Sequence, residues 1–127
     1  MKYKNKQLIL RFMQNFFGSK WFSYPGLFKL RAFVYRKFFG IGPNSIIEND
    51  VWLYRTHGYS GKIVFGDRIL LARHVQIDYT GEVIIEDDVW FSEGASVHSH
   101  SHEITRERLS RGQDSISLKS IHFREGC

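Results

Sequence analysis

The chain has little of several features that define whole classes of protein. Its single cysteine, Cys127, excludes a disulfide within the chain, and nothing indicates an oxidising compartment. It has two prolines and no low-complexity tract, and aromatic residues make up 16% of its 127 residues, which argues against disorder. We therefore expect a folded chain of the size of one domain.

Long apolar runs are also missing. The stretch Leu8, Ile9, Leu10 ends at Arg11, which is too short for the core of a signal peptide or for a transmembrane helix. Because neither export nor membrane spanning is indicated, the sequence predicts a cytoplasmic protein.

Acidic residues are absent from the first part of the chain. All thirteen Asp and Glu residues follow Ile47, whereas nine of the Lys and Arg residues lie within residues 1–40. This imbalance divides the chain into a basic, aromatic segment at 1–46 and a mixed-charge region at 47–127.

Two stretches of the basic segment have apolar residues at helical spacing. The first runs from Gln7 to Phe17 and is followed by Gly18, and the second runs from Leu27 to Phe39 and is followed by Gly40. Glycine after the last periodic residue is a common helix stop. The segment is therefore predicted to be α-helical.

From Ile47 the apolar pattern has a period of six. The first positions of these rungs are all large and apolar, with a two-residue interruption at Val83 and Ile84. They are Ile47, Leu53, Tyr59, Phe65, Leu71, Ile77, Ile85, Phe91 and Val97. The fifth positions are smaller: Val51, His57, Ile63, Ile69, Val75, Gly81, Val89, Ala95 and Ser101.

This spacing predicts a parallel β-helix. The fifth position and the next first position share one face of a strand, while positions two to four carry turn residues such as Gly66 and Asp67. Three rungs would form one coil, stacked on the next through parallel hydrogen bonds. An antiparallel sheet with irregular turns is the alternative, but it needs neither turns every six residues nor nine apolar first positions. We therefore expect a mainly β fold with an N-terminal α-helical segment.

The rungs F-G-D-R-I-L and I-E-D-D-V-W-F-S-E-G-A-S-V, closed by S-H-S-H-E, resemble the hexapeptide-repeat acyltransferases. The chain looks most like the acetyltransferases of capsule and surface-polysaccharide assembly, and the resemblance covers residues 27–127. It implies a left-handed β-helix, a homotrimer and acetyl-CoA as acyl donor. The handedness comes from the resemblance alone, because parallel crossovers are otherwise right-handed.

The family motif T-H-x-H-[DE] is matched by residues 99–103, and the resemblance implies that His102 is the general base. Independently, the rung count places His102 at an outward sixth position that a neighbouring subunit could cover. Imidazole has a suitable pKa for removing a proton from a sugar hydroxyl or amine that attacks a thioester. Substrate-binding roles are predicted for Asp78, Trp90, His100 and Glu103, of which Glu103 or Asp78 could orient the base. Trp90 suits a subunit interface better than the acceptor site.

The alternation of His98, His100 and His102 could also indicate a metal site. The rung count places His98 and His100 in a corner, so the three would not lie along one strand. No metal is therefore expected.

The basic segment has three interpretations: a cap over the first coil, a membrane anchor, or a nucleic-acid surface. A solenoid needs its end covered, so capping by the second helix is expected. Residues 1–22 exceed what a cap needs and suit peripheral contact with the inner face of an anionic membrane. Nucleic acid is not expected, because no recognised binding module accompanies the charge.

A polar loop is predicted at 104–115, and a further rung begins at Phe123 shortly before the sequence ends. In the resembled family W-I-G and several coils follow this point and build much of the acetyl-CoA site. We therefore expect a truncated chain that represents the acceptor side of the enzyme. Two functions follow: an O- or N-acetyltransferase acting on a saccharide or nucleotide sugar, or a non-catalytic β-helix scaffold.

Overall fold

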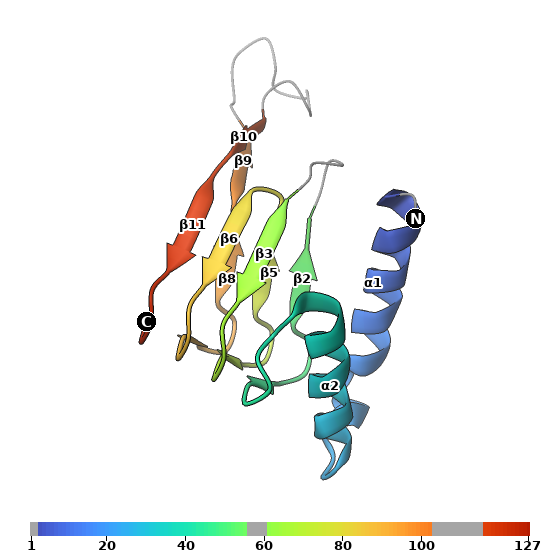
Figure 1. The fold of residues 1–127 in the computed structure, drawn as a ribbon. Coiled ribbons are helices and arrows are strands. Elements are labelled where there is room, and N and C mark those ends of the chain that lie inside the picture. The colour runs from blue at the N-terminus through green and yellow to red at the C-terminus, as the bar shows by residue number, and fades with distance from the viewer. Residues whose placement is uncertain (1–2, 56–60, 103–115) are drawn as a thin grey trace.

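The computed structural model describes residues 3–55, 61–102 and 116–127 of the chain. Helix α1 (Tyr3–Phe17), the short 3-10 helix η1 (Lys20–Ser23) and helix α2 (Leu27–Phe39) lie together at one end of a stack of strands (Figure 1). Both helices occur where the apolar spacing predicts them, and α1 begins four residues before Gln7. Gly40 caps the end of α2: its N–H donates to the carbonyl of Arg36 at 2.8 Å, and its φ of 73° turns the chain out of the helix.

The strands are short and mostly parallel. They are β1 (Ile46–Ile47), β2 (Trp52–Tyr54), β3 (Lys62–Phe65), β4 (Leu70–Leu71), β5 (Gln76–Asp78), β6 (Glu82–Ile85), β7 (Trp90–Phe91), β8 (Ser96–His98), β9 (His100–His102), β10 (Ile116–Leu118) and β11 (Ser120–Phe123). Three parallel sheets have the orders β1-β4-β7, β2-β5-β8 and β3-β6-β11, and β9 pairs with β10 antiparallel. The chain thus visits the three sheets in a fixed rotation, and we call each pass through them a circuit.

The large apolar residues of the repeat stack in register between circuits. Three ladders result: Ile47 beside Leu71 beside Phe91, Leu53 beside Ile77 beside Val97, and Phe65 beside Ile85 beside Phe123. All except Phe123 are buried, and together with the fifth-position residues they form most of the core. Burial of apolar surface in these ladders stabilises the stack.

The turns between strands use the left-handed backbone conformation at the fourth position of a rung. Asp50, Arg68, His74 and Asp88 have φ values between 54° and 62°, and Gly94 and Gly126 have values of 78° and 79°. Each of these residues lies three positions after a first-position residue. The prediction that positions two to four turn the chain is therefore confirmed.

The strand pairing predicted between the first and the second circuit is wrong. Three rungs of six would place Ile47 beside Phe65, but Ile47 pairs with Leu71. The cause is an insertion between β2 and β3, which separates Leu53 from Phe65 by twelve residues instead of six. Tyr59 and His57, assigned to rung positions from the count, lie outside the described residues.

The interruption assigned to Val83 and Ile84 is also wrong. Both residues belong to strand β6, where Val83 is fully buried and pairs with Ile63 and Ile121. Val83 therefore occupies the fifth position that the count gave to Gly81. The two additional residues precede the strand, at the turn after β5.

The structure thus shows two α-helices and parallel strands in three small sheets, an arrangement compatible with the predicted β-helix.

The helices bond backbone groups at the edge of the first circuit. Gln14 of α1 is buried and bonds both backbone groups of Leu53, with its Nε2 donating to the carbonyl at 2.8 Å and its Oε1 accepting from the N–H at 2.7 Å. The Tyr35 hydroxyl of α2 donates to the carbonyl of Val51 at 2.9 Å. These side chains occupy positions that a further strand would otherwise fill, so α1 as well as α2 covers the edge.

Replacing Gln14 by glutamate should therefore destabilise the fold. The substitution removes the donor to the Leu53 carbonyl and places a carboxylate oxygen opposite it in a buried site. We expect the free energy of unfolding to fall by about 2 to 3 kcal/mol, measured by urea denaturation. Asn15→Asp, on the exposed side of α1, is the control and should change it by less than about 0.5 kcal/mol. Equal effects of the two substitutions would contradict the capping role.

Candidate functional site

All the extra residues of the repeat are inserted at one corner, between the second and the third sheet. The corner is short in the second circuit, where three residues separate β5 from β6, and in the third circuit the chain leaves the sheets there as β9 and β10 before it returns as β11. Both ends of this short turn are anchored in the core, because Ile77 before it and Val83 after it are buried. Most of the predicted site residues lie at this corner.

Asp78, the last residue of β5, is the centre of a buried polar cluster. Its carboxylate accepts hydrogen bonds from the backbone N–H of Thr80 at 2.9 Å and from that of Ser99 at 3.1 Å. It also contacts the Thr80 hydroxyl and Nδ1 of His100. Asp78 is wholly buried and 12% of the His100 side chain is exposed, so the cluster opens to solvent through the histidine.

Ser99 ties this cluster to the neighbouring circuit. Its hydroxyl donates to the carbonyl of Asp78 at 2.6 Å and accepts from the N–H of Gly81 at 2.9 Å. A Cβ atom at Gly81 would lie 2.5 Å from the carbonyl oxygen of Ser99 and 2.3 Å from that of Lys119, so only glycine fits between the circuits. The cluster is thus held rigidly by backbone groups on both sides.

The electrostatics of the cluster favour a charged carboxylate. Burial alone would raise the pKa of Asp78, but the hydrogen bonds from Thr80 and His100 outweigh it and leave the pKa below its ordinary value of 3.8. Three of the donors belong to the protein backbone or to a hydroxyl, and the fourth is the imidazole of His100. A carboxylate that holds one ring nitrogen of a histidine fixes the orientation of the ring, as in many acid–base sites.

A surface groove adjoins the cluster at Thr80. Its lining residues come from the same corner and from the returning chain: Gly61, Lys62, Thr80, Gly81, Glu82, Leu118, Lys119 and Ser120. Backbone groups, hydroxyls and charges of both signs line this groove. Such a surface can bind a ligand with several hydroxyl groups, for which hydrogen bonding rather than apolar burial gives the orientation.

The structure brings together only part of the predicted set. Asp78 contacts His100, whereas the sequence left open whether it would orient His102. Trp90 is 68% exposed in strand β7, on a different sheet, and no described contact joins it to Asp78 or His100. His98 is exposed in β8 and shares a hydrogen bond of 3.1 Å with the Ser96 hydroxyl.

The predicted place of His102 in the repeat is wrong. Its backbone belongs to β9, which pairs with Ile116 of β10 in an antiparallel hairpin, and not to the sixth position of a parallel rung. The rung ends early because Ser99 turns towards Asp78 and the chain then leaves the sheets. The side chain of His102, all of Glu103 and the predicted loop at 104–115 lie outside the described residues.

Thr80 and Ser99 belong to the cluster but were not among the predicted site residues. For Thr80 a signal was present, because Asp-x-Thr-Gly at residues 78–81 is typical of a turn in which the carboxylate bonds the backbone two residues later. The contact of Ser99 with Asp78 spans 21 residues and has no local signal.

The parts of the chain that the structure describes contain no group of three or more His, Cys, Asp or Glu side chains that could hold a metal ion. None of the described helices is long and apolar enough to cross a membrane.

Comparison of the chain with protein-family models, with curated proteins and with solved structures finds no match. The acyltransferase interpretation therefore depends on the repeat and the motif in the sequence.

Proposed function

We propose that the chain is an acetyl-CoA-dependent O- or N-acetyltransferase that acts on a saccharide or nucleotide sugar, with His102 as general base. The observation that carries the proposal is the Asp78–His100 pair at the base of the β9–β10 hairpin. Keeping a carboxylate charged at a fully buried position is costly, and such pairs occur often at functional sites. Here His100 lies two residues from His102 in the sequence, and Thr80, which bonds Asp78, lines the neighbouring groove.

The proposed reaction needs one base and one positioned acceptor. The acceptor oxygen or nitrogen attacks the thioester carbonyl of acetyl-CoA while His102 takes its proton, and collapse of the adduct releases the CoA thiolate and the acetylated sugar. His100, held by Asp78, would orient the acceptor beside the base. Backbone N–H groups could stabilise the oxyanion.

The proposal includes an architecture. We infer that the three parallel sheets are the faces of a left-handed β-helix and that the active assembly is a homotrimer, as in the acyltransferases that the repeat resembles. The fixed rotation of the chain through three parallel sheets supports the β-helical arrangement, and the hand and the trimer follow from the resemblance alone. Trp90, which is exposed on β7, would then lie at a subunit interface.

Acetyl-CoA turnover with a panel of sugars and nucleotide sugars tests the function. We expect the intact chain to acetylate at least one acceptor and His102→Ala to lower kcat/KM about a hundredfold. His98→Ala is the matched control, because this histidine is exposed on the neighbouring strand and should be dispensable.

Two other outcomes would change the assignment. If His100→Ala abolished turnover while His102→Ala retained it, the base would be His100. Failure of the intact chain to bind CoA or to acetylate any acceptor would instead favour a non-catalytic scaffold.

A further inference from the structure

Apolar side chains cover the outward faces of both helices. Helix α1 packs Leu10, Met13 and Gln14 against the strands, so the opposite side of this helix faces solvent. The exposed apolar and aromatic residues of this region are Leu8, Ile9, Phe12, Phe16, Trp21, Tyr24, Leu27, Phe28, Leu30, Phe33 and Phe38. We call them the outer face. Phe12 is 70% exposed and Trp21 is 69% exposed, and apolar patches of this kind mark interaction surfaces.

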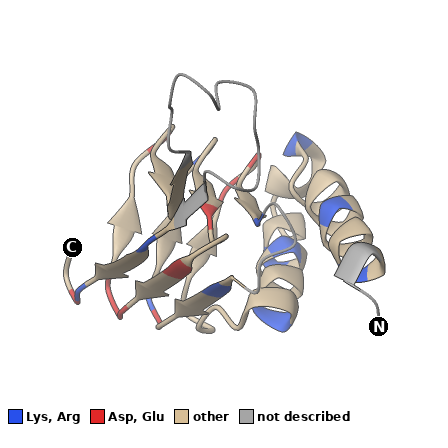
Figure 2. Cartoon of the chain, turned by 90° about the horizontal axis from the view of Figure 1, so that it is seen from above, with Lys and Arg blue, Asp and Glu red and all other residues tan. Residues whose placement is uncertain are grey.

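The charge on the helices that carry the outer face has one sign. Figure 2 shows Lys and Arg on both helices and no Asp or Glu on either. Exposed cations lie among the aromatic residues: Lys6, Arg11, Lys20, Lys29, Arg36 and Lys37. A partner that complements this surface must offer negative charge and accept apolar side chains at the same time.

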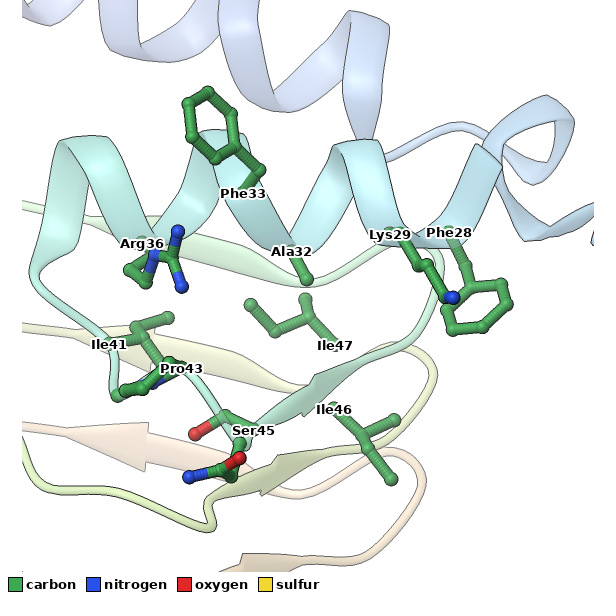
Figure 3. A pocket seen from close by; sticks show the side chains of 12 residues that line it. Phe28, Lys29, Ala32, Phe33, Arg36, Ile41, Pro43, Ser45, Ile46 and Ile47 are labelled. Carbon is green, nitrogen blue, oxygen red and sulfur yellow. The ribbon is translucent and has the colours of Figure 1, made fainter. Parts of the chain in front are cut away.

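A groove between α2 and β1 continues this surface (Figure 3). Phe28 and Phe33 of the outer face line it together with Ile46, and Lys29 and Arg36 are the two charged residues of its lining. Among the residues that the structure describes, no acidic side chain belongs to the lining of the groove. It could therefore take an anionic head group whose acyl chains lie against the neighbouring aromatic side chains.

We propose that the outer face and this groove form a docking surface for an anionic phospholipid membrane. Basic residues interleaved with Trp, Phe and Leu are the features of helices that lie in the membrane interface, where the rings enter the acyl boundary and the cations contact head groups. The proposal goes beyond acetyl transfer and does not depend on it, because membrane binding needs no catalysis.

Charge argues against a second copy of the chain as the occupant. A symmetric contact between two outer faces would bring like charges together without any acidic residue from residues 1–47 to offset them. Nucleic acid would satisfy the cations but would leave most of the exposed apolar side chains in water. An anionic lipid surface complements both properties.

Vesicle flotation with the intact chain tests the proposal. We expect the chain to float with phosphatidylcholine vesicles that contain phosphatidylglycerol, but not with pure phosphatidylcholine, and to bind less at high salt. Phe12→Ser with Phe16→Ser should weaken binding at least about tenfold, since each ring leaves the acyl boundary. Lys29→Gln with Arg36→Gln should weaken it about fivefold per charge.

Matched controls lie on the sheets. Val64→Ser removes an exposed apolar side chain from β3, and Lys62→Gln removes an exposed cation from the same strand, so neither should alter flotation. Removing residues 1–22 is a poor test, because it would also remove Gln14 and uncover Leu53. Thermal unfolding of each variant verifies that the fold is retained.

Several results would overturn the proposal. These are no flotation with anionic vesicles, equal flotation with neutral vesicles, or an equal loss in Val64→Ser. A smaller assembly in light scattering for Phe12→Ser with Phe16→Ser, without vesicle binding by the parent chain, would assign the outer face to a second copy. Binding of duplex DNA in place of vesicles would assign it to nucleic acid.

Discussion

Arg31→Met is expected to lower the free energy of unfolding by about 3 to 5 kcal/mol, measured by urea denaturation followed by circular dichroism. Arg31 is a residue of α2 and is 1% exposed. It lies where the helical segment contacts the first circuit. Methionine preserves much of the apolar stem but removes the guanidinium. The effect should therefore report lost hydrogen bonds more than lost packing.

The size of this effect follows from what the guanidinium holds. Nε donates to the Phe17 carbonyl at 2.8 Å, Nη2 to the Ser19 carbonyl at 2.8 Å, and Nη1 to the Ile47 carbonyl at 3.1 Å. Nη2 also donates to the Ser23 hydroxyl at 3.0 Å. One side chain thus joins the end of α1, the linker and β1, and burial lowers its pKa because charge is costly there.

Lys29→Met is the matched control for Arg31→Met. Lys29 lies half a turn away on the exposed side of α2, so its replacement should change the free energy of unfolding by less than about 0.5 kcal/mol. If Arg31→Met were equally mild, the polar contacts of the cap would contribute little, and apolar packing alone would hold the helices on the strands.

Local patterns predicted the elements of this fold well. The spacing of apolar residues and the two following glycines marked the ends of both helices, and the six-residue period marked most of the strands. These features depend on neighbours within a few residues, so the chain itself carries the signal. The turn positions were predictable for the same reason.

The register between circuits could not be predicted from the period. The insertion between Leu53 and Phe65 adds six residues, which is the length of one rung, and Tyr59 supplies an apolar residue where a rung would begin. A count of sixes cannot distinguish such an insertion from a real rung. Only the pairing of Ile47 with Leu71 shows the difference.

Long-range polar contacts were the other feature without a sequence signal. Gln14 and Arg31 read as ordinary polar residues of amphipathic helices, yet both are buried because they replace strand partners at the edge of the sheets. Likewise, the choice of His100 as the partner of Asp78 depends on how Ser99 turns the chain. The motif at residues 99–103 indicated His100, but the contact of His100 with Asp78 arises from the stacking of one circuit on the next.

Asp78→Ala is expected to destabilise the protein by about 3 to 5 kcal/mol at pH 7. The substitution leaves the N–H groups of Thr80 and Ser99 without their acceptor at a buried corner, and it removes the contact that holds His100. Asp88→Asn is the control: Asp88 pairs with Arg68 at a turn, 41% of its side chain is exposed, and asparagine tolerates the left-handed backbone there, so the loss of this charge should be far milder.

The destabilisation by Asp78→Ala should depend on pH with a defined sign. The pKa of Asp78 is lowered in the folded protein, so ionisation of this carboxylate stabilises the fold above the ordinary pKa of 3.8, and the contribution is lost as pH falls through the lowered value. Unfolding of parent and Asp78→Ala chains, measured from pH 7 down to about pH 2, should therefore show a difference that is constant near neutrality and shrinks below about pH 4. A difference that stayed constant to the lowest pH would mean that the carboxylate acts only by filling space. A shrinking difference would establish that a charged Asp78 holds the corner from which His100 and the β9–β10 hairpin begin.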